Sequence, residues 1–139
     1  MLRGTIRTLS EAVRARVGAR VRELVQGIAA ACGATAEVEL LPGYPVLVND
    51  ADIVRRVLDV AVRVGFDAGH VTMLDPQGGA EDFAYYAQHV PAAFVFLGAR
   101  SDEPGCSYPH HHPRFQIDER ALPWGAALLA QYALGTSRG

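Results

Sequence analysis

The stretch RGTIRTLSEAVRARVGARVRELVQGIAAACGATAEVELL, residues 3–41, changes its hydrophobic period twice and thereby indicates the fold class. Residues 3–9 are short, alternating and rich in β-branched side chains, which predicts a strand. After Ser10, which is placed to cap a helix, apolar side chains recur at steps of three and four residues. This period predicts a helix that ends at Gly33, with an apolar stripe made of Val13, Val17, Val21, Leu24 and Ile28.

Residues 34–41 return to a period of two, with Ala36, Val38 and Leu40 on one side. The intervening side chains are polar or charged, which is typical of a half-buried strand with one wet face. The opening stretch therefore predicts a β-α-β unit in which the helix covers the apolar face of the strands.

The rest of the chain predicts a second α/β segment. Pro42, Gly43 and Pro45 interrupt the pattern and indicate a linker or domain boundary, after which Asn49 or Asp50 can cap a helix. That helix has a wide apolar face made of Ile53, Val54, Val57, Leu58, Ala61 and Val64. That helix spans 51–64. After it we predict a strand over 70–74, a short helix over 80–89 and a strand over 92–98. A loop over 99–117 follows, and a last helix runs from the Asp118 cap to about Leu134.

Composition excludes several functional classes. The formal charge of -2 gives no basic field, so we expect no nucleic-acid partner. No apolar run approaches the ~20 residues that span a bilayer, and the N-terminal residues lack the apolar core of a signal peptide, so we expect a cytoplasmic protein without a membrane partner. Cys32 and Cys106 share no metal-binding or redox spacing and are expected to be free thiols.

Three consecutive histidines, His110, His111 and His112, form the most conspicuous candidate site. Consecutive loop residues point in different directions, so one of them could be a metal ligand but all three could not share one ion. A loop of this length after a buried strand is typical of a functional segment. The alternative is an exposed polar loop, and local composition alone favours that alternative, because no other ligand stands at metal-binding spacing.

Two further candidates have equally ordinary alternatives. Glu81 and Asp82 follow Gly78 and Gly79, and a carboxylate pair beside two glycines could line a substrate pocket. Acidic residues at a helix start are also favoured by the helix dipole alone. Arg7 lies in a predicted strand, where an arginine usually faces solvent, but its planar fork would suit a carboxylate if that face lines a cleft. Phe83, Tyr85, Tyr86 and Trp124 are assigned to packing.

Taken together, four stretches resemble the C-terminal part of the M20 family of metal-dependent amidohydrolases. They are GTIRT (4–8), YPVLVND (44–50), GGAEDFAYY (78–86) and HHPRFQIDE (111–119), and they stand in the order of the family. The branch they resemble includes hippurate hydrolases, N-acyl-amino-acid amidohydrolases and auxin-conjugate hydrolases. The four stretches span nearly the whole chain, which makes the resemblance specific although each one alone is weak.

The resemblance implies an α/β fold, in which the last part of a zinc-peptidase-like catalytic domain is preceded by a β-α-β half of a ferredoxin-like lid. Residues 1–43 would be the partial lid, or dimerisation domain, and residues 44–139 the C-terminal segment of the catalytic domain. In many members of the family the lid dimerises, so the full-length enzyme is expected to be a homodimer.

The resemblance also implies roles for individual residues. His111 is similar to the last metal ligand of the family, with Pro113 and Phe115 matching the same motif. Arg7 resembles the arginine that grips the carboxylate of the substrate, and Gly79, Glu81 and Asp82 would line the pocket near the scissile bond. The substrate would be an N-acyl amino acid and the cofactor a pair of Zn, Mn, Co or Ni ions. Gly78 departs from the methionine that is usual at its position.

The family's other metal ligands, and the glutamate expected to act as general base, lie in upstream motifs that do not occur in this chain. We therefore expect at most one partial metal site, no catalytic residue and no hydrolysis by residues 1–139 alone. Two other readings stay open. The chain could be a non-catalytic interaction module that dimerises through its β-α-β edge, or one half of a split enzyme completed by a second polypeptide.

Overall fold

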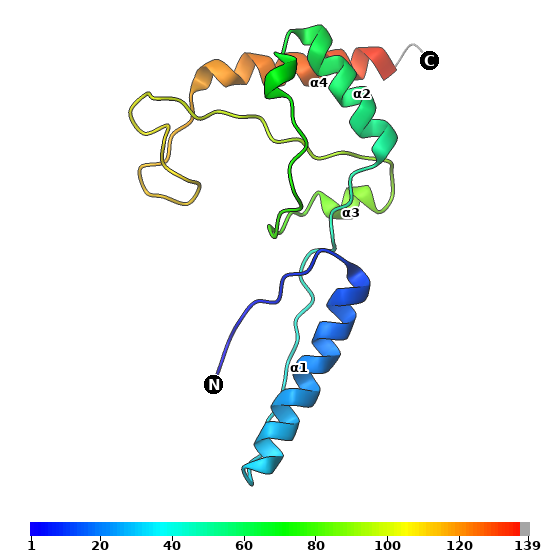
Figure 1. The fold of residues 1–139 in the computed structure, drawn as a ribbon, viewed down its shortest axis with the longest axis vertical. Helices are drawn as coiled ribbons and strands as arrows, with labels where there is room; N and C mark the ends of the chain where they lie inside the picture. Colours follow the sequence, from blue (N-terminus) through cyan, green and yellow to red (C-terminus); the bar gives the residue numbers. More distant parts are fainter. Residues whose placement is uncertain (137–139) are drawn as a thin grey trace. The chain divides into compact units, whose positions relative to one another are not determined.

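The computed structural model describes residues 1–136, and in them the chain forms helices joined by long irregular segments (Figure 1). Two compact units are present. The first consists of Met1–Val48 and Leu74–Pro91, and the second of Asn49–Met73 and the chain from Ala92 onward. The elements are α1 (Glu11–Ala31), α2 (Ala51–Val64), the 3-10 turn η1 (Ala68–His70), α3 (Ala84–Ala87), the 3-10 turn η2 (Glu119–Ala121) and α4 (Leu122–Thr136).

Strands are predicted over 3–9, 34–41, 70–74 and 92–98, but none of them forms within residues 1–136, which contain helices and turns. The physical reason is that a strand exists only as part of a ladder, and its hydrogen bonds must come from a neighbouring strand. None of these segments finds such a neighbour within residues 1–136. An alternating pattern predicts which side chains share a face, but it cannot supply the partner.

The first unit is built on α1, which begins after Ser10 and ends at Ala31, and the predicted stop residue Gly33 follows its C-cap. Ser10 stands at the N-cap position but its side chain makes no capping hydrogen bond. At the other end Gly33 has a φ of 68°, and the amide of Ala34 donates to the carbonyl oxygen of Ala29 (2.9 Å), which together close the helix in a Schellman motif.

Residues 34–41 run beside α1 (Figure 1), and their burial follows the predicted alternation even without a ladder. Ala36, Val38 and Leu40 are half-buried, whereas the side chains between them are exposed. Leu40 lies so close to α1 that a Cβ added at Gly18 would stand 3.3 Å from its Cδ1. The period-two pattern therefore identified the face that packs on the helix.

The predicted linker is tied to the start of α1 by Glu11 and Arg14. The guanidinium of Arg14 donates to the carbonyl oxygens of Gly43 (3.0 Å) and Tyr44 (3.1 Å), and Glu11 Oε1 accepts from the amide of Val46 (2.7 Å). These bonds satisfy backbone groups in a segment whose prolines prevent regular structure.

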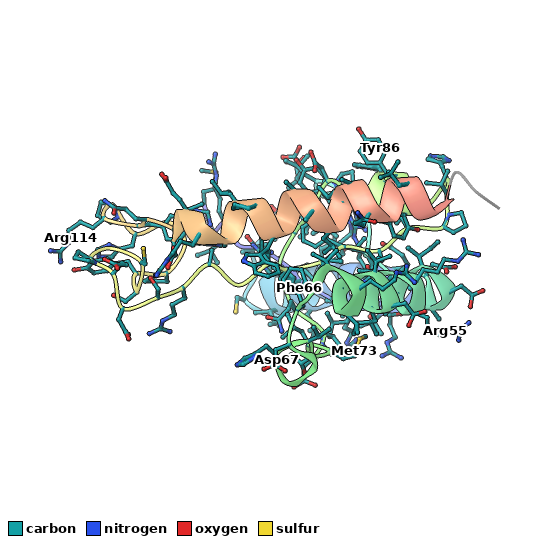
Figure 2. All side chains as sticks on the ribbon, turned by 90° about the horizontal axis from the view of Figure 1, so that it is seen from above. Arg55, Phe66, Asp67, Met73, Tyr86 and Arg114 are labelled. Atoms are coloured by element: carbon teal, nitrogen blue, oxygen red, sulfur yellow. The ribbon has the colours of Figure 1, made fainter. Side chains whose placement is uncertain are left out.

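The second unit is built on α2 and α4, which lie side by side (Figure 2). Of the two predicted caps, Asn49 and Asp50, it is Asp50 that caps α2, because its carboxylate accepts from the amides of Asp52 (2.9 Å) and Ile53 (3.0 Å). The rings of Phe66 and Trp124 meet at a centroid distance of 5.4 Å, which confirms that Trp124 packs. On α2 the predicted apolar face is half-buried or buried, and the arginines stand outside it.

The predicted helix over 80–89 is reduced to the four residues of α3, flanked by turns. Ala84, the first residue of α3, is fully buried. The last helix agrees better with its prediction. Asp118 accepts from the amide of Arg120 (3.0 Å) and thereby caps η2, which leads directly into α4.

Burial is sparse in both units. Within the described residues only Val60, Ala61, Ala84 and Cys106 are buried. Helix α4 contains no charged residue, yet Leu129 is 72% exposed and Leu134 is 57% exposed. A helix that is apolar on all sides is normally enclosed by a larger core. No helix in the described part of the chain is both long and apolar enough to cross a membrane.

Candidate functional site

The predicted site residues fall in both units. Arg7, Gly79, Glu81 and Asp82 belong to the first unit, and His111 belongs to the second. Each set is therefore described in its own surroundings.

Arg7 is brought to the glycine pair although 71 positions separate them in the sequence. Its Nη1 donates to the carbonyl oxygen of Gly78 at 2.9 Å, and its side chain is exposed. A fixed guanidinium retains further N–H groups for a planar acceptor such as a carboxylate. Two of the four stretches that define the resemblance, GTIRT and GGAEDFAYY, thus meet in one unit.

The two acidic residues differ in their surroundings. Glu81 is half-buried, and its Oε1 accepts from the amide of Phe83 at 3.2 Å, so it acts locally as the start of the turn that leads into α3. Asp82 is exposed, and within the described residues no side chain bonds to its carboxylate. A Cβ added at Gly79 would meet no atom within 4 Å, so the backbone there borders open space. Of the two carboxylates, that of Asp82 is the one free to meet a ligand.

His111 lies in a loop that is closed at two levels. The outer closure is the bond from the amide of Asp118 to the carbonyl oxygen of Ala99 (2.9 Å). The inner closure is Gly105, whose carbonyl oxygen accepts from the amides of Gln116 (3.2 Å) and Tyr108 (3.3 Å). Gly105 has a φ of 90°, which favours glycine, and an added Cβ would stand 2.9 Å from Cδ of Gln116. Residues 105–116 therefore form a compact Ω-type loop.

Two of the three histidines are held by aromatic rings. His112 stacks on Tyr108 with ring centroids 4.1 Å apart and an angle of 5° between the planes. Its Nδ1 also accepts from the amide of Arg114 at 3.1 Å, and the Arg114 guanidinium lies 4.6 Å from the centroid of the Tyr108 ring. His110 meets Phe115 edge to face at 4.8 Å. Figure 2 shows Arg114 at the end of this loop, away from α2 and α4.

His111 differs from its two neighbours in its backbone conformation and in the surroundings of its ring. It has a φ of 69° and is the one residue other than glycine with positive φ in the described part of the chain. A side chain in this region is strained, and such residues occur often at functional sites. The His111 ring is exposed, and within the described residues it makes no side-chain hydrogen bond and no ring contact. The structure therefore separates the three histidines into two whose rings contact an aromatic side chain and one, His111, whose exposed ring does not.

The base of the loop is fixed electrostatically by Asp118 and Arg120. Arg120 Nε donates to both carboxylate oxygens of Asp118, at 2.8 and 3.0 Å. This paired hydrogen bond, together with the Arg120 amide, holds the pKa of Asp118 well below its ordinary value. An open cavity of about 630 Å³ lies beside the pair, lined by Arg100, Ser101, Asp102, Glu103, Ser107 and Arg120, and it includes none of the predicted site residues.

The resemblance implies a divalent metal, for which His111 is the predicted ligand in this chain. Within residues 1–136 no three His, Cys, Asp or Glu side chains gather to hold an ion. A free, exposed imidazole such as that of His111 fits as one ligand, but a complete site needs three or four. The described residues could therefore supply one ligand to a metal site, but they do not form a complete site by themselves.

Sequence reasoning missed the residues that hold the loop. The one usable signal in the sequence was Gly105, six positions before His111, because a glycine inside a loop often marks a turn with positive φ. The pairing of Tyr108 with His112 and of His110 with Phe115 gave none, because ring contacts depend on the path of the loop backbone.

Comparisons with known proteins agree on the class. Residues 4–135 match the family model of peptidase family M20/M25/M40. The chain is 37% identical over 133 residues to thermostable carboxypeptidase 2 of Saccharolobus solfataricus, covering 93% of this chain and 33% of that protein. It is 33% identical over 133 residues to the N-acetylcysteine deacetylase of Bacillus subtilis, covering 96% and 33%. A crystal structure described as an aminohydrolase from methicillin-resistant Staphylococcus aureus superposes with a TM-score of 0.71 at 35% identity, covering 90% and 31%.

These matches define a hydrolase family. The chain belongs to peptidase family M20/M25/M40, whose peptidases are generally metal-dependent. It is similar to carboxypeptidases, amidohydrolases and deacetylases, and it spans about a third of the length of these relatives (33% to 34%). The suspected resemblance to the M20 family is therefore confirmed.

Proposed function

We propose that these residues form the C-terminal part of a metal-dependent amidohydrolase that cleaves the amide bond of N-acyl amino acids. In this proposal residues 1–43 belong to a ferredoxin-like lid and residues 44–139 to an α/β catalytic domain. The observation that carries the proposal is the exposed His111 ring, which makes no ring contact within the described residues, whereas both neighbouring histidine rings contact an aromatic side chain. Family membership supplies the reaction class.

His111 would hold one divalent metal ion through a ring nitrogen. Zinc, manganese, cobalt and nickel all accept an imidazole ligand, so the identity of the ion is not part of the proposal. A bound ion would supply Lewis acidity and an activated water at the scissile amide.

Arg7 would bind the free carboxylate of the acyl amino acid. The bond from its Nη1 to the carbonyl oxygen of Gly78 fixes one side of the guanidinium, so that less side-chain entropy is lost when the carboxylate binds. Gly79 would leave room for the substrate beside it, since a Cβ at this position would meet nothing within 4 Å. Glu81 and Asp82 would line the same pocket, with the exposed Asp82 nearer to the ligand.

Residues 1–136 hold too few ligands for the chemistry, because no group of three metal-binding side chains occurs among them. We therefore propose that the remaining ligands and the general base lie outside these residues, in the part of the relatives that this chain does not span. The apolar and largely exposed α4 supports this proposal, since a helix without charged residues is expected to be covered in the functional protein.

The first test uses the 139-residue chain. Purified chain is incubated with N-acetyl amino acids and zinc, manganese or cobalt, and release of the free amino acid is followed. We expect no hydrolysis above the buffer rate. Metal-dependent turnover that disappears in His111→Ala would overturn the proposed incompleteness of the site.

The second test supplies the missing part. Residues 4–135 replace the matched third of the Bacillus subtilis N-acetylcysteine deacetylase, and deacetylation of N-acetylcysteine is measured. We expect metal-dependent hydrolysis that is lost in His111→Ala and kept in His89→Ala, an exposed histidine outside the site. Arg7→Ala should raise KM with a smaller change in kcat. A graft that folds and binds metal equally well without His111 would refute the assignment of this ligand.

A second candidate function is favoured by the same exposure of α4. The chain could act as a non-catalytic interaction module, with a homodimer as the simplest assembly. Light scattering over a range of concentrations distinguishes this candidate. A constant monomer mass at high concentration would argue against it, whereas a dimer that lacks activity in the graft experiment would favour it.

A further inference from the structure

We propose that Tyr108 is a positioning residue that makes His111 the one presented histidine of the loop. Through its stack on His112, Tyr108 fixes the turn in which His111 takes positive φ and directs its ring to solvent. The connection to a metal rests on the proposed function, but the presentation of His111 can be tested without any metal.

The first step of the argument is the parallel contact between Tyr108 and His112. Rings 4.1 Å apart at 5° are in close stacking geometry, and the Arg114 guanidinium covers the Tyr108 ring at 4.6 Å. Both kinds of contact are attractive and depend on the ring being in place. The second bond to His112, from the amide of Arg114 to Nδ1, occupies one ring nitrogen. His112 is therefore restrained on its face and on one edge.

The second step concerns the backbone. The amide of His112 donates to the carbonyl oxygen of Pro109 (3.2 Å), and the amide of Phe115 donates to the carbonyl oxygen of His112 (2.9 Å). His111 lies inside the first of these turns with a φ of 69°. A non-glycine residue at positive φ is strained, so it persists only where the surroundings favour the conformation. The Tyr108 stack supplies such a restraint on the adjacent residue, His112.

The third step is the consequence for the three rings. His110 meets Phe115 and His112 meets Tyr108, whereas His111 has neither contact. Without the Tyr108 ring, the turn would lose its hold on His112, and His111 could relax to negative φ and turn its ring elsewhere. Tyr108 thus acts on His111 through its neighbour and does not need to touch a ligand itself.

The test is carbethoxylation of the metal-free 139-residue chain with diethylpyrocarbonate, with the site of modification mapped by mass spectrometry. In the native chain we expect His111 to react faster than His110 and His112. In Tyr108→Leu the rate of His112 should rise severalfold and the preference for His111 should disappear. Tyr108→Phe retains the ring and should restore the native order. Tyr85→Leu removes a different aromatic pair, with Tyr44, and should change nothing in the loop.

A second measurement tests the inference even if Tyr108→Leu changes the conformation of the whole loop. The intraresidue amide-to-Hα cross-peak of His111, which is strong at positive φ, should weaken in Tyr108→Leu and return in Tyr108→Phe. An unchanged cross-peak and an unchanged order of reactivity in Tyr108→Leu would overturn the positioning role. If Tyr108 controls the order but His111→Ala does not weaken metal binding by the grafted enzyme, the proposed function fails and the positioning role stands.

Discussion

Gly105→Ala is the substitution whose effect on the histidine loop follows most directly from the structure. Gly105 closes the loop through the two amides that its carbonyl oxygen accepts, and its φ of 90° lies where L side chains are strained. That strain destabilises the loop by roughly 1–2 kcal/mol. Replacing glycine also lowers the entropy of the unfolded chain, which stabilises the folded state by about 0.4–1 kcal/mol and offsets part of the strain. An added Cβ would also stand 2.9 Å from Cδ and 3.1 Å from Cγ of Gln116.

The expected net loss of loop stability is about 1 kcal/mol, or roughly a fivefold larger open population. The assay is amide hydrogen exchange of Gln116 and Tyr108, whose amides bond to Gly105. Both should exchange about five times faster in Gly105→Ala, again from the strain estimate. Gly98→Ala is the matched control, because its added Cβ meets nothing within 4 Å and its φ is not positive.

The contribution of Gln116 can be separated from that of the backbone. In a Gln116→Ala background the steric part disappears and the φ part remains, so the loss caused by Gly105→Ala should become smaller without vanishing. Equal exchange rates in the native chain and Gly105→Ala would refute the reasoning, because they would mean that the loop is not held at this position.

Three further predictions test the elements around the loop. Gly27→Ala should stabilise α1 by up to about 1 kcal/mol in chemical denaturation, since Gly27 is helical and its added Cβ meets nothing within 4 Å. Asp50→Ala should destabilise α2 by about 1 kcal/mol through loss of its two capping bonds, whereas Asp50→Asn should lose little. In Arg120→Gln the pKa of Asp118 should rise toward its ordinary value, which NMR titration measures. The pairing lowers the pKa of Asp118 in the folded protein. Its contribution to folding stability is therefore present at pH values above the pKa of Asp118 in the unfolded chain, and it is lost as the pH falls through the pKa of the folded state.

The helices could be predicted from the sequence because their hydrogen bonds are local. The apolar period and the Asp50 cap located α2 as Ala51–Val64, and Gly33 located the end of α1. The strands could not be predicted in the same way. The alternation of 34–41 correctly identified Ala36, Val38 and Leu40 as the packed side, but the neighbour needed for a ladder is a long-range property.

For the candidate site, too, the sequence indicated some features and the structure added others. The sequence selected His111 among three histidines by resemblance, and the structure supplies an independent physical distinction, because only His111 lacks a ring contact among the three. It also joins Arg7 to Gly78 across 71 positions, which no local pattern indicates. The roles of Gly79, Glu81 and Asp82 stay predictions, since they depend on a substrate.

The most direct test of the central claim is the metal affinity of the grafted deacetylase, measured by competition with a chelator. We expect His111→Ala to weaken binding by at least about 100-fold, as removal of a ligand must exceed the 10–100-fold loss typical of residues that only support ligands. His110→Ala should weaken it far less, and His112→Ala should fall between the two, because His112 acts on His111 only through the turn that they share. Equal losses in all three variants, or none in His111→Ala, would contradict the account.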